Sequence, residues 1–153
     1  LTDPVTISVR QGATVAGIDQ DVIKVTSKEH KLQVLSDLLR QPEFGKVLVF
    51  GQTKWGVQNL ADSLTKEGWW DESIHSNTST PQRQRALKAF KANQVQILVA
   101  TDVAARGLDI PDVSHVINFD QPSTYEDYIH RIGRTGRAGK AGKALTLLSS
   151  IAE

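Results

Sequence analysis

Short apolar segments alternate with stretches of helical periodicity along the chain. The apolar segments are rich in β-branched residues and predict strands over 5–9, 18–25, 47–50, 72–75, 95–100, 113–119 and 144–148. Segments such as 47–50 and 97–99 are apolar at every position, which is typical of strands that are covered on both faces. The pattern therefore predicts buried strands joined by helices.

Helix-start signals separate several of these strands. We expect helices that are capped by Thr26 with Glu29 as a capping box, by Thr53, by Thr80 followed by Pro81, and by Ser123 with Glu126 as a second capping box. Strands of four to six residues that alternate with helices are typical of βαβ units. The predicted fold class is α/β, with an open, doubly wound and mostly parallel sheet.

Length and composition favour one domain. The 153 residues are 39% hydrophobic and 23% charged, which is typical of a globular domain with a single core, and we assign 1–153 to one domain. We find no long apolar run and no signal-peptide pattern, so we expect a protein that does not engage membranes and is cytoplasmic, with the nucleus as the alternative in a eukaryote. The chain contains no Cys and no Met, and its first residue is Leu1, so we interpret it as a piece of a longer protein.

Positive charge is concentrated in one Gly-rich segment. The net charge is only +1, yet 130–143 holds no acidic residue and the basic residues Arg131, Arg134, Arg137, Lys140 and Lys143. A basic patch on a nearly neutral protein favours a partner that carries phosphate, either a nucleotide or a nucleic acid.

Polar residues follow the predicted strands at 51–54, 75–77, 101–102 and 118–120. The carboxyl ends of parallel strands meet at one edge of a sheet, where ligands usually bind. Each of these residues taken alone could simply cap a helix or make a turn. Four such segments at one edge, close to the basic segment, favour a binding site.

Two dense segments carry most of the candidate chemistry. The segment 100–109 offers hydroxyl, carboxylate and guanidinium groups, and Asp109 suits a ribose hydroxyl. In 130–137, Arg134 and Arg137 are three residues apart, so one helical turn would place both guanidinium groups on the same side. Planar guanidinium groups bind phosphate in a bidentate manner, although a lone Arg more often makes a structural ion pair. We find no G-x-x-x-x-G-K-[ST] loop, because Gly142-Lys143 is followed by Ala144.

These segments resemble the C-terminal RecA-like domain of DEAD-box ATP-dependent RNA helicases, over about residues 3–148. The resemblance rests on 47–54 (the fourth motif), 82–85 (the Gln-x-x-Arg element), 100–110 (the fifth motif), 118–120, and 130–137 (the sixth motif). It implies a RecA-like three-layer α/β/α fold. It also implies that ATP and Mg²⁺ are held by an N-terminal RecA-like domain that this chain lacks.

The resemblance assigns roles residue by residue. It implies RNA-backbone contacts by Gln82, Arg85, Thr101, Arg106 and Gly107, a ribose contact by Asp109, γ-phosphate contacts by Arg134 and Arg137, and coupling of the two sites by Asp102, His130 and Arg131. The implied partners are RNA, the N-terminal domain and protein adaptors, and the isolated domain is expected to be inactive. The sequence departs from the family pattern at Ser76, where Gly is usual, and at Trp69-Trp70. We expect this Trp pair to pack at a helix end, with base stacking as the alternative.

Two alternatives remain. A superfamily 2 helicase or translocase that acts on DNA would share the arginines. A RecA-like module without catalytic activity could bind RNA or protein if its partner domain lacked the nucleotide-binding loop.

Overall fold

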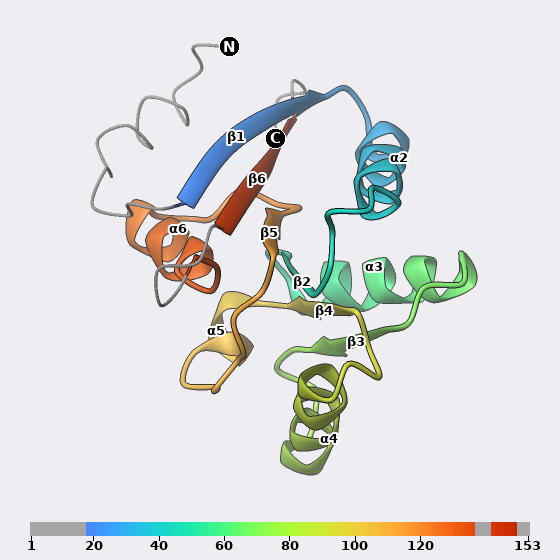
Figure 1. Ribbon diagram of the computed structural model, residues 1–153, viewed down its shortest axis with the longest axis vertical. Helices are drawn as coiled ribbons and strands as arrows, with labels where there is room; N and C mark the ends of the chain where they lie inside the picture. Colours follow the sequence, from blue (N-terminus) through green and yellow to red (C-terminus); the bar gives the residue numbers. More distant parts are fainter. Residues whose placement is uncertain (1–17, 137–141, 150–153) are drawn as a thin grey trace.

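A six-stranded parallel sheet organises the chain in the computed structural model, which describes residues 18–136 and 142–149 (Figure 1). The strands are β1 (Ile18–Val25), β2 (Val47–Phe50), β3 (Asp71–Ile74), β4 (Ile97–Ala100), β5 (His115–Asn118) and β6 (Gly142–Ser149). Their order across the sheet is β1-β6-β5-β2-β4-β3, and every neighbouring pair is parallel. The predicted strand at 5–9 and the predicted site residue Arg137 lie outside the described residues.

Helices cover both faces of the sheet. They are α2 (Lys28–Leu39), α3 (Lys54–Lys66), α4 (Thr80–Lys91), α5 (Asp102–Ala105) and α6 (Tyr125–Ile132). Alternate residues of β2 point to opposite faces: Leu48 and Phe50 pack with α4, α5 and α6, and Val47 and Val49 pack with α2 and α3. This arrangement is a RecA-like three-layer α/β/α fold, so the predicted fold class is confirmed.

Three of the predicted capping residues are wrong by one position. The side chains that cap the helices are Ser27 for α2, Ser79 for α4 and Thr124 for α6, which accept from the backbone N–H groups of His30, Gln82 and Asp127. In each case the capping residue has an extended backbone and the helix begins at the next residue. The predicted cap of α3, Thr53, is confirmed by its hydrogen bond from the N–H of Gly56.

The two departures from the family pattern have clear structures. Trp69 packs against the core beneath α2 and α3, as expected, whereas Trp70 is 71% exposed. Among the described residues Asn93 is the one non-glycine residue with positive φ, so Ser76 does not need the backbone freedom of glycine. Over the same residues we find no helix that is long and apolar enough to span a bilayer.

Candidate functional site

The polar segments after the strands do meet at the carboxyl edge of the sheet. The backbone N–H of Gln52, after β2, donates to Asp120 Oδ2, after β5, at 2.8 Å, and Gln52 Nε2 donates to Ser123 Oγ at 2.7 Å. Lys54 Nζ donates to Asn77 Oδ1, after β3, at 3.4 Å. The predicted clustering at one edge is therefore confirmed.

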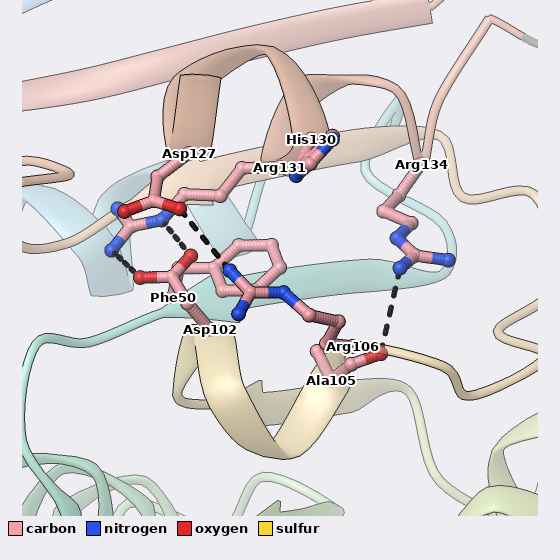
Figure 2. Close-up of a pocket in the computed structure, with 8 residues that line it drawn as sticks. All are labelled: Phe50, Asp102, Ala105, Arg106, Asp127, His130, Arg131 and Arg134. Carbon is pink, nitrogen blue, oxygen red and sulfur yellow. Dashed lines mark hydrogen bonds and ion pairs between the residues drawn. The ribbon is translucent and has the colours of Figure 1, made fainter. Parts of the chain in front are cut away.

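A pocket of about 160 Å³ opens between α5 and α6 at this edge (Figure 2). Its lining contains five of the predicted site residues: Asp102, Arg106, His130, Arg131 and Arg134. Phe50, Ala105 and Asp127 complete the lining. The fold thus brings together side chains from the two segments, 100–109 and 130–137, that the sequence marked as dense in chemistry.

Arg131 fixes the floor of this pocket. Its Nε and Nη2 donate to the two carboxylate oxygens of Asp102 at 2.7 and 2.8 Å, and its Nη1 donates to the backbone oxygen of Asp120 at 2.7 Å and to Asn118 Oδ1 at 3.2 Å. The guanidinium carbon lies 5.0 Å from the centroid of the Phe50 ring. Arg131 is buried and its donors are engaged within the protein, so it acts as a positioning residue that ties α6 to α5.

The remaining cations of the pocket are more accessible. Arg106 is exposed and its Nη2 lies 3.3 Å from Asp127 Oδ1, while His130 is exposed at the pocket rim. Arg134 is half-buried, and its Nη1 and Nη2 donate to the backbone oxygens of Leu108 and Ala105, both at 3.4 Å. In Figure 2 the guanidinium group of Arg106 is directed toward Asp127, and that of Arg134 is directed toward Ala105 on the other side of the pocket.

The place of Arg134 can be described, whereas the predicted turn that would join it to Arg137 extends beyond the described residues. Helix α6 ends at Ile132 and is capped at Gly133, so Arg134 lies beyond it. Its backbone N–H donates to the oxygen of Arg131 at 3.2 Å, and its oxygen accepts from the N–H of Val113 at 3.1 Å. The neighbouring Thr135 hydroxyl donates to the backbone oxygen of Val113. The end of α6 and the segment before β5 therefore hold this arginine together.

Other predicted site residues lie outside the pocket. Gln82 and Arg85 of α4 line a second cavity of about 300 Å³, together with Gln58, Glu72, Ser73, His75, Asn77 and Thr78. Thr101 is buried and its hydroxyl accepts from the N–H of Ala104, so it caps α5. Gly107 has φ of +80° and open space where a Cβ would be. The side chain of Asp109 is 88% exposed and pairs with Lys91 at 3.3 Å.

The second cavity, which we call the α4 cavity, contains a histidine that is held neutral. Burial, followed by the charges of Lys54 and Arg83, lowers the pKa of His75. Its Nδ1 accepts from the N–H of Asn77 at 3.2 Å, so its Nε2 carries the proton and donates to Gln58 Oε1 at 2.9 Å. His75 therefore orders Gln58 and the loop after β3.

The α5–α6 pocket suits phosphate better than a metal ion. Both of its carboxylates, on Asp102 and Asp127, are engaged by arginines, while Arg106 and Arg134 present guanidinium groups to the opening. Within 18–136 and 142–149, we find no group of three or more His, Asp or Glu side chains placed to hold a metal. The residues present fit the phosphate part of ATP.

Asp127 and Phe50 are lining residues that sequence reasoning missed as site residues. Asp127 lies in the predicted helix at 123–132 and Phe50 ends a predicted strand, so neither stands out from its local pattern. Their positions in the pocket depend on α5 and α6 facing each other, and no local signal could have revealed this.

Comparison with known proteins agrees with this geometry. Residues 30–139 match the model of the helicase conserved C-terminal domain. The chain is similar to the E. coli DEAD-box protein SrmB, solved bound to the regulator of ribonuclease activity A, with 42% identity and a TM-score of 0.79 over 86% of this chain and 78% of that one. It is also similar to the yeast DEAD-box splicing factor Prp28, with 33% identity and a TM-score of 0.84 over 99% of this chain and 36% of that one.

A third similar structure is S. cerevisiae Dbp5 bound to RNA and ADP–BeF3, with 34% identity and a TM-score of 0.81 over 90% of this chain. The chain spans 37% of the length of that protein. The family match covers most of the chain and includes both helices that form the pocket. The chain belongs to the helicase conserved C-terminal domain family.

Proposed function

We propose that this chain is the C-terminal RecA-like domain of a DEAD-box ATP-dependent RNA helicase, acting in the cytoplasm. In this proposal 1–153 is one domain of a longer protein whose N-terminal RecA-like domain holds ATP and Mg²⁺. The similarity to SrmB, Prp28 and Dbp5, each described as a DEAD-box protein, supports the RNA-directed class, and Dbp5 was solved bound to RNA. The complex of SrmB with a regulatory protein supports adaptor proteins as further partners.

The observation that carries the proposal is the bidentate Asp102–Arg131 pair. It joins the first residue of α5 to the last turn of α6, with N–O distances of 2.7 and 2.8 Å. Because this pair is internal, the α5–α6 pocket keeps Arg106, His130 and Arg134 at its opening. A change at either helix would move the other, which is the coupling role proposed for Asp102, His130 and Arg131.

Arg134 and Arg137 are proposed to reach the γ-phosphate across the cleft between the two domains. When bound, ATP with Mg²⁺ supplies the phosphoryl group whose hydrolysis drives the cycle. Arg134 now donates to two backbone oxygens at 3.4 Å, and a side-chain rotation could direct the same donors toward phosphate oxygens. Asp109, with an exposed carboxylate, would accept from the ribose hydroxyls.

The proposed RNA contacts lie along the carboxyl edge of the sheet and on α4. Gln82 and Arg85 line the α4 cavity, and the positive φ and open surroundings of Gly107 allow a strand to approach the backbone closely. Thr101 accepts one hydrogen bond through its hydroxyl oxygen and keeps its O–H as a donor. Together with Arg106, these groups suit the phosphate and sugar of RNA, so we expect binding with little sequence preference. A strand that is bent on this surface would no longer fit an A-form duplex, and we expect the duplex to open locally there.

The decisive test is removal of the arginines from the complete protein. Arg134→Ala and Arg137→Ala should each lower RNA-stimulated ATP hydrolysis steeply, toward the factor of about 10³ to 10⁵ that such an arginine contributes in phosphoryl transfer. RNA binding should largely survive. Arg40→Ala is the matched control, because Arg40 is exposed on the far end of α2 and pairs only weakly with Asp37 at 3.2 Å.

Unchanged turnover in both arginine variants would refute their role. Comparing stimulation by RNA and by DNA decides between the RNA helicase and the DNA-acting alternative. The isolated chain should not hydrolyse ATP at the rate of its complete parent, and equal rates would overturn the proposal that the site is shared between two domains.

A further inference from the structure

Trp55 stands on the first turn of α3 with 66% of its surface exposed. A tryptophan usually buries most of its surface, because its ring is the largest apolar group among the side chains. Trp55 belongs to neither core cluster. Its ring is therefore presented to solvent at the carboxyl edge of the sheet, where α3 begins.

The surroundings of the ring are cationic and polar. Lys54 Nζ lies 5.3 Å from the centroid of the Trp55 ring and also donates to Asn77 Oδ1 at 3.4 Å. The first turn of α3 carries no acidic residue, and its N-terminus adds a partial positive charge. A polyanion that passes over this turn would meet favourable charge on the side where the ring is exposed.

Lys54 and Gln58 link the ring to the α4 cavity. Gln58 lines that cavity and lies three residues after Trp55 in α3, so the two side chains share one side of the helix. Asn77, the acceptor for Lys54, lines the same cavity. The cavity offers amide and guanidinium groups from Gln82 and Arg85, with Glu72 as its acidic member. Hydrogen-bonding groups for phosphate and sugar thus lie beside a flat aromatic surface.

We propose that Trp55 is a stacking platform for one base of the single-stranded RNA whose backbone lies over the α4 cavity. The inference rests on the proposed RNA-binding function and adds to it a contact with a base. Every base has a π-face, so the contact would add affinity without reading sequence. Trp55 and Lys54 together would hold a base and its adjoining phosphate.

Trp70 provides a matched control at the other side of the molecule. It is 71% exposed, comparable to Trp55. It directly precedes β3, whereas Trp55 follows β2, so in this parallel sheet the two rings lie at opposite edges. If any exposed tryptophan strengthened RNA binding, both variants would show it. If stacking beside the α4 cavity is the cause, only the Trp55 variants will.

The experiment measures the affinity of the complete protein, with a non-hydrolysable ATP analogue, for two short fluorescein-labelled single strands. One is ordinary RNA and the other is an RNA of the same length with abasic nucleotides. Trp55→Ala should weaken binding of ordinary RNA by about 5-fold or more, the lower end for one base stacked on an aromatic ring. The affinity for the abasic strand and the salt dependence of binding should stay unchanged, because the contacts to the RNA backbone remain.

Further variants make each outcome decisive. Trp55→Phe should recover most of the affinity, and Trp55→Leu, which keeps an apolar helix-forming residue without a ring, should behave as Trp55→Ala. Trp70→Ala should bind both strands as wild type does. If Trp55→Ala binds ordinary RNA as tightly as wild type does, or loses affinity equally for both strands, the stacking role is overturned. The proposed RNA-binding function would not be affected by either result. A wild-type protein that binds neither strand would overturn the proposed function as well.

Discussion

Replacing Asp102 by Ala should destabilise the chain strongly, because it leaves the Arg131 guanidinium buried without a counter-charge. The side chain of Arg131 has no exposed surface, and two of its hydrogen bonds, at 2.7 and 2.8 Å, go to the carboxylate of Asp102. Hydrogen bonds to charged groups contribute about 1.5 to 3 kcal/mol each. Its remaining acceptors, Asn118 Oδ1 and the backbone oxygen of Asp120, are neutral. We expect a loss of about 3 to 5 kcal/mol in the free energy of unfolding.

Urea unfolding followed by circular dichroism measures this loss. Asp127→Ala is the control, because Asp127 lies in the same pocket and also pairs with an arginine, Arg106. That arginine is 60% exposed and the N–O distance is 3.3 Å, so the control should lose less than about 1 kcal/mol. The double variant Asp102→Ala with Arg131→Met should be more stable than Asp102→Ala alone, because it removes the unpaired charge.

A loss of less than about 1 kcal/mol for Asp102→Ala, equal to that of Asp127→Ala, would refute the reasoning. It would mean that water or a rearranged side chain compensates the Arg131 charge. The pair could then not be the connection that holds α5 against α6.

Three further outcomes are expected. Burial raises the pKa of Asp71 to about 6, above its value of about 3.9 in the unfolded chain, so the protonated form stabilises the fold and this stability is lost as the pH rises through about 6. Urea unfolding across this range should therefore show wild type losing stability relative to Asp71→Asn, and parallel profiles would contradict it. Gly142→Ala would place its Cβ 2.7 Å from Cα of Gly136 and should cost about 1 to 3 kcal/mol in thermal or urea unfolding, whereas Gly45→Ala, whose nearest contact is 3.7 Å away, should unfold as wild type does. Arg85→Ala in the complete protein should weaken RNA binding and reduce the slope of log affinity against log salt by about one unit, and a normal slope would count against a phosphate contact.

The sheet and its edge were predictable because their signals are local. Fully apolar runs such as 47–50 give buried strands, and polar residues after parallel strands must share an edge. The capping residues of the helices were harder to predict, since Thr80 and Ser79 both have side chains that cap helices well. The choice depends on which residue has an extended backbone as the chain enters the helix, and the surrounding structure decides this.

The partners within the site could not be read from spacing. Asp102 and Arg131 are 29 residues apart, and they meet because β4 and β5 flank β2 and bring α5 and α6 to one face. The spacing of Arg134 and Arg137 resembled a helical turn; α6 stops at Ile132, and Arg137 lies outside the described residues. The exposure of Trp55 follows from the apolar stripe of Val57, Leu60, Ala61 and Leu64 that α3 turns to the core, because Trp55 lies off that stripe.

The position of β6 has a consequence for how the chain folds during its synthesis. β6 is the last strand of the sheet in the sequence, but it lies between β1 and β5, so β1 joins the sheet only through it. The pairing of Ile18 with Gly142 spans nearly the whole domain, which makes it slow to form. Until residues 142–149 leave the ribosome, β1 and β5 present unpaired backbone edges that other chains could join. A truncation before Gly142 would therefore remove two strands from the sheet, although it deletes only one.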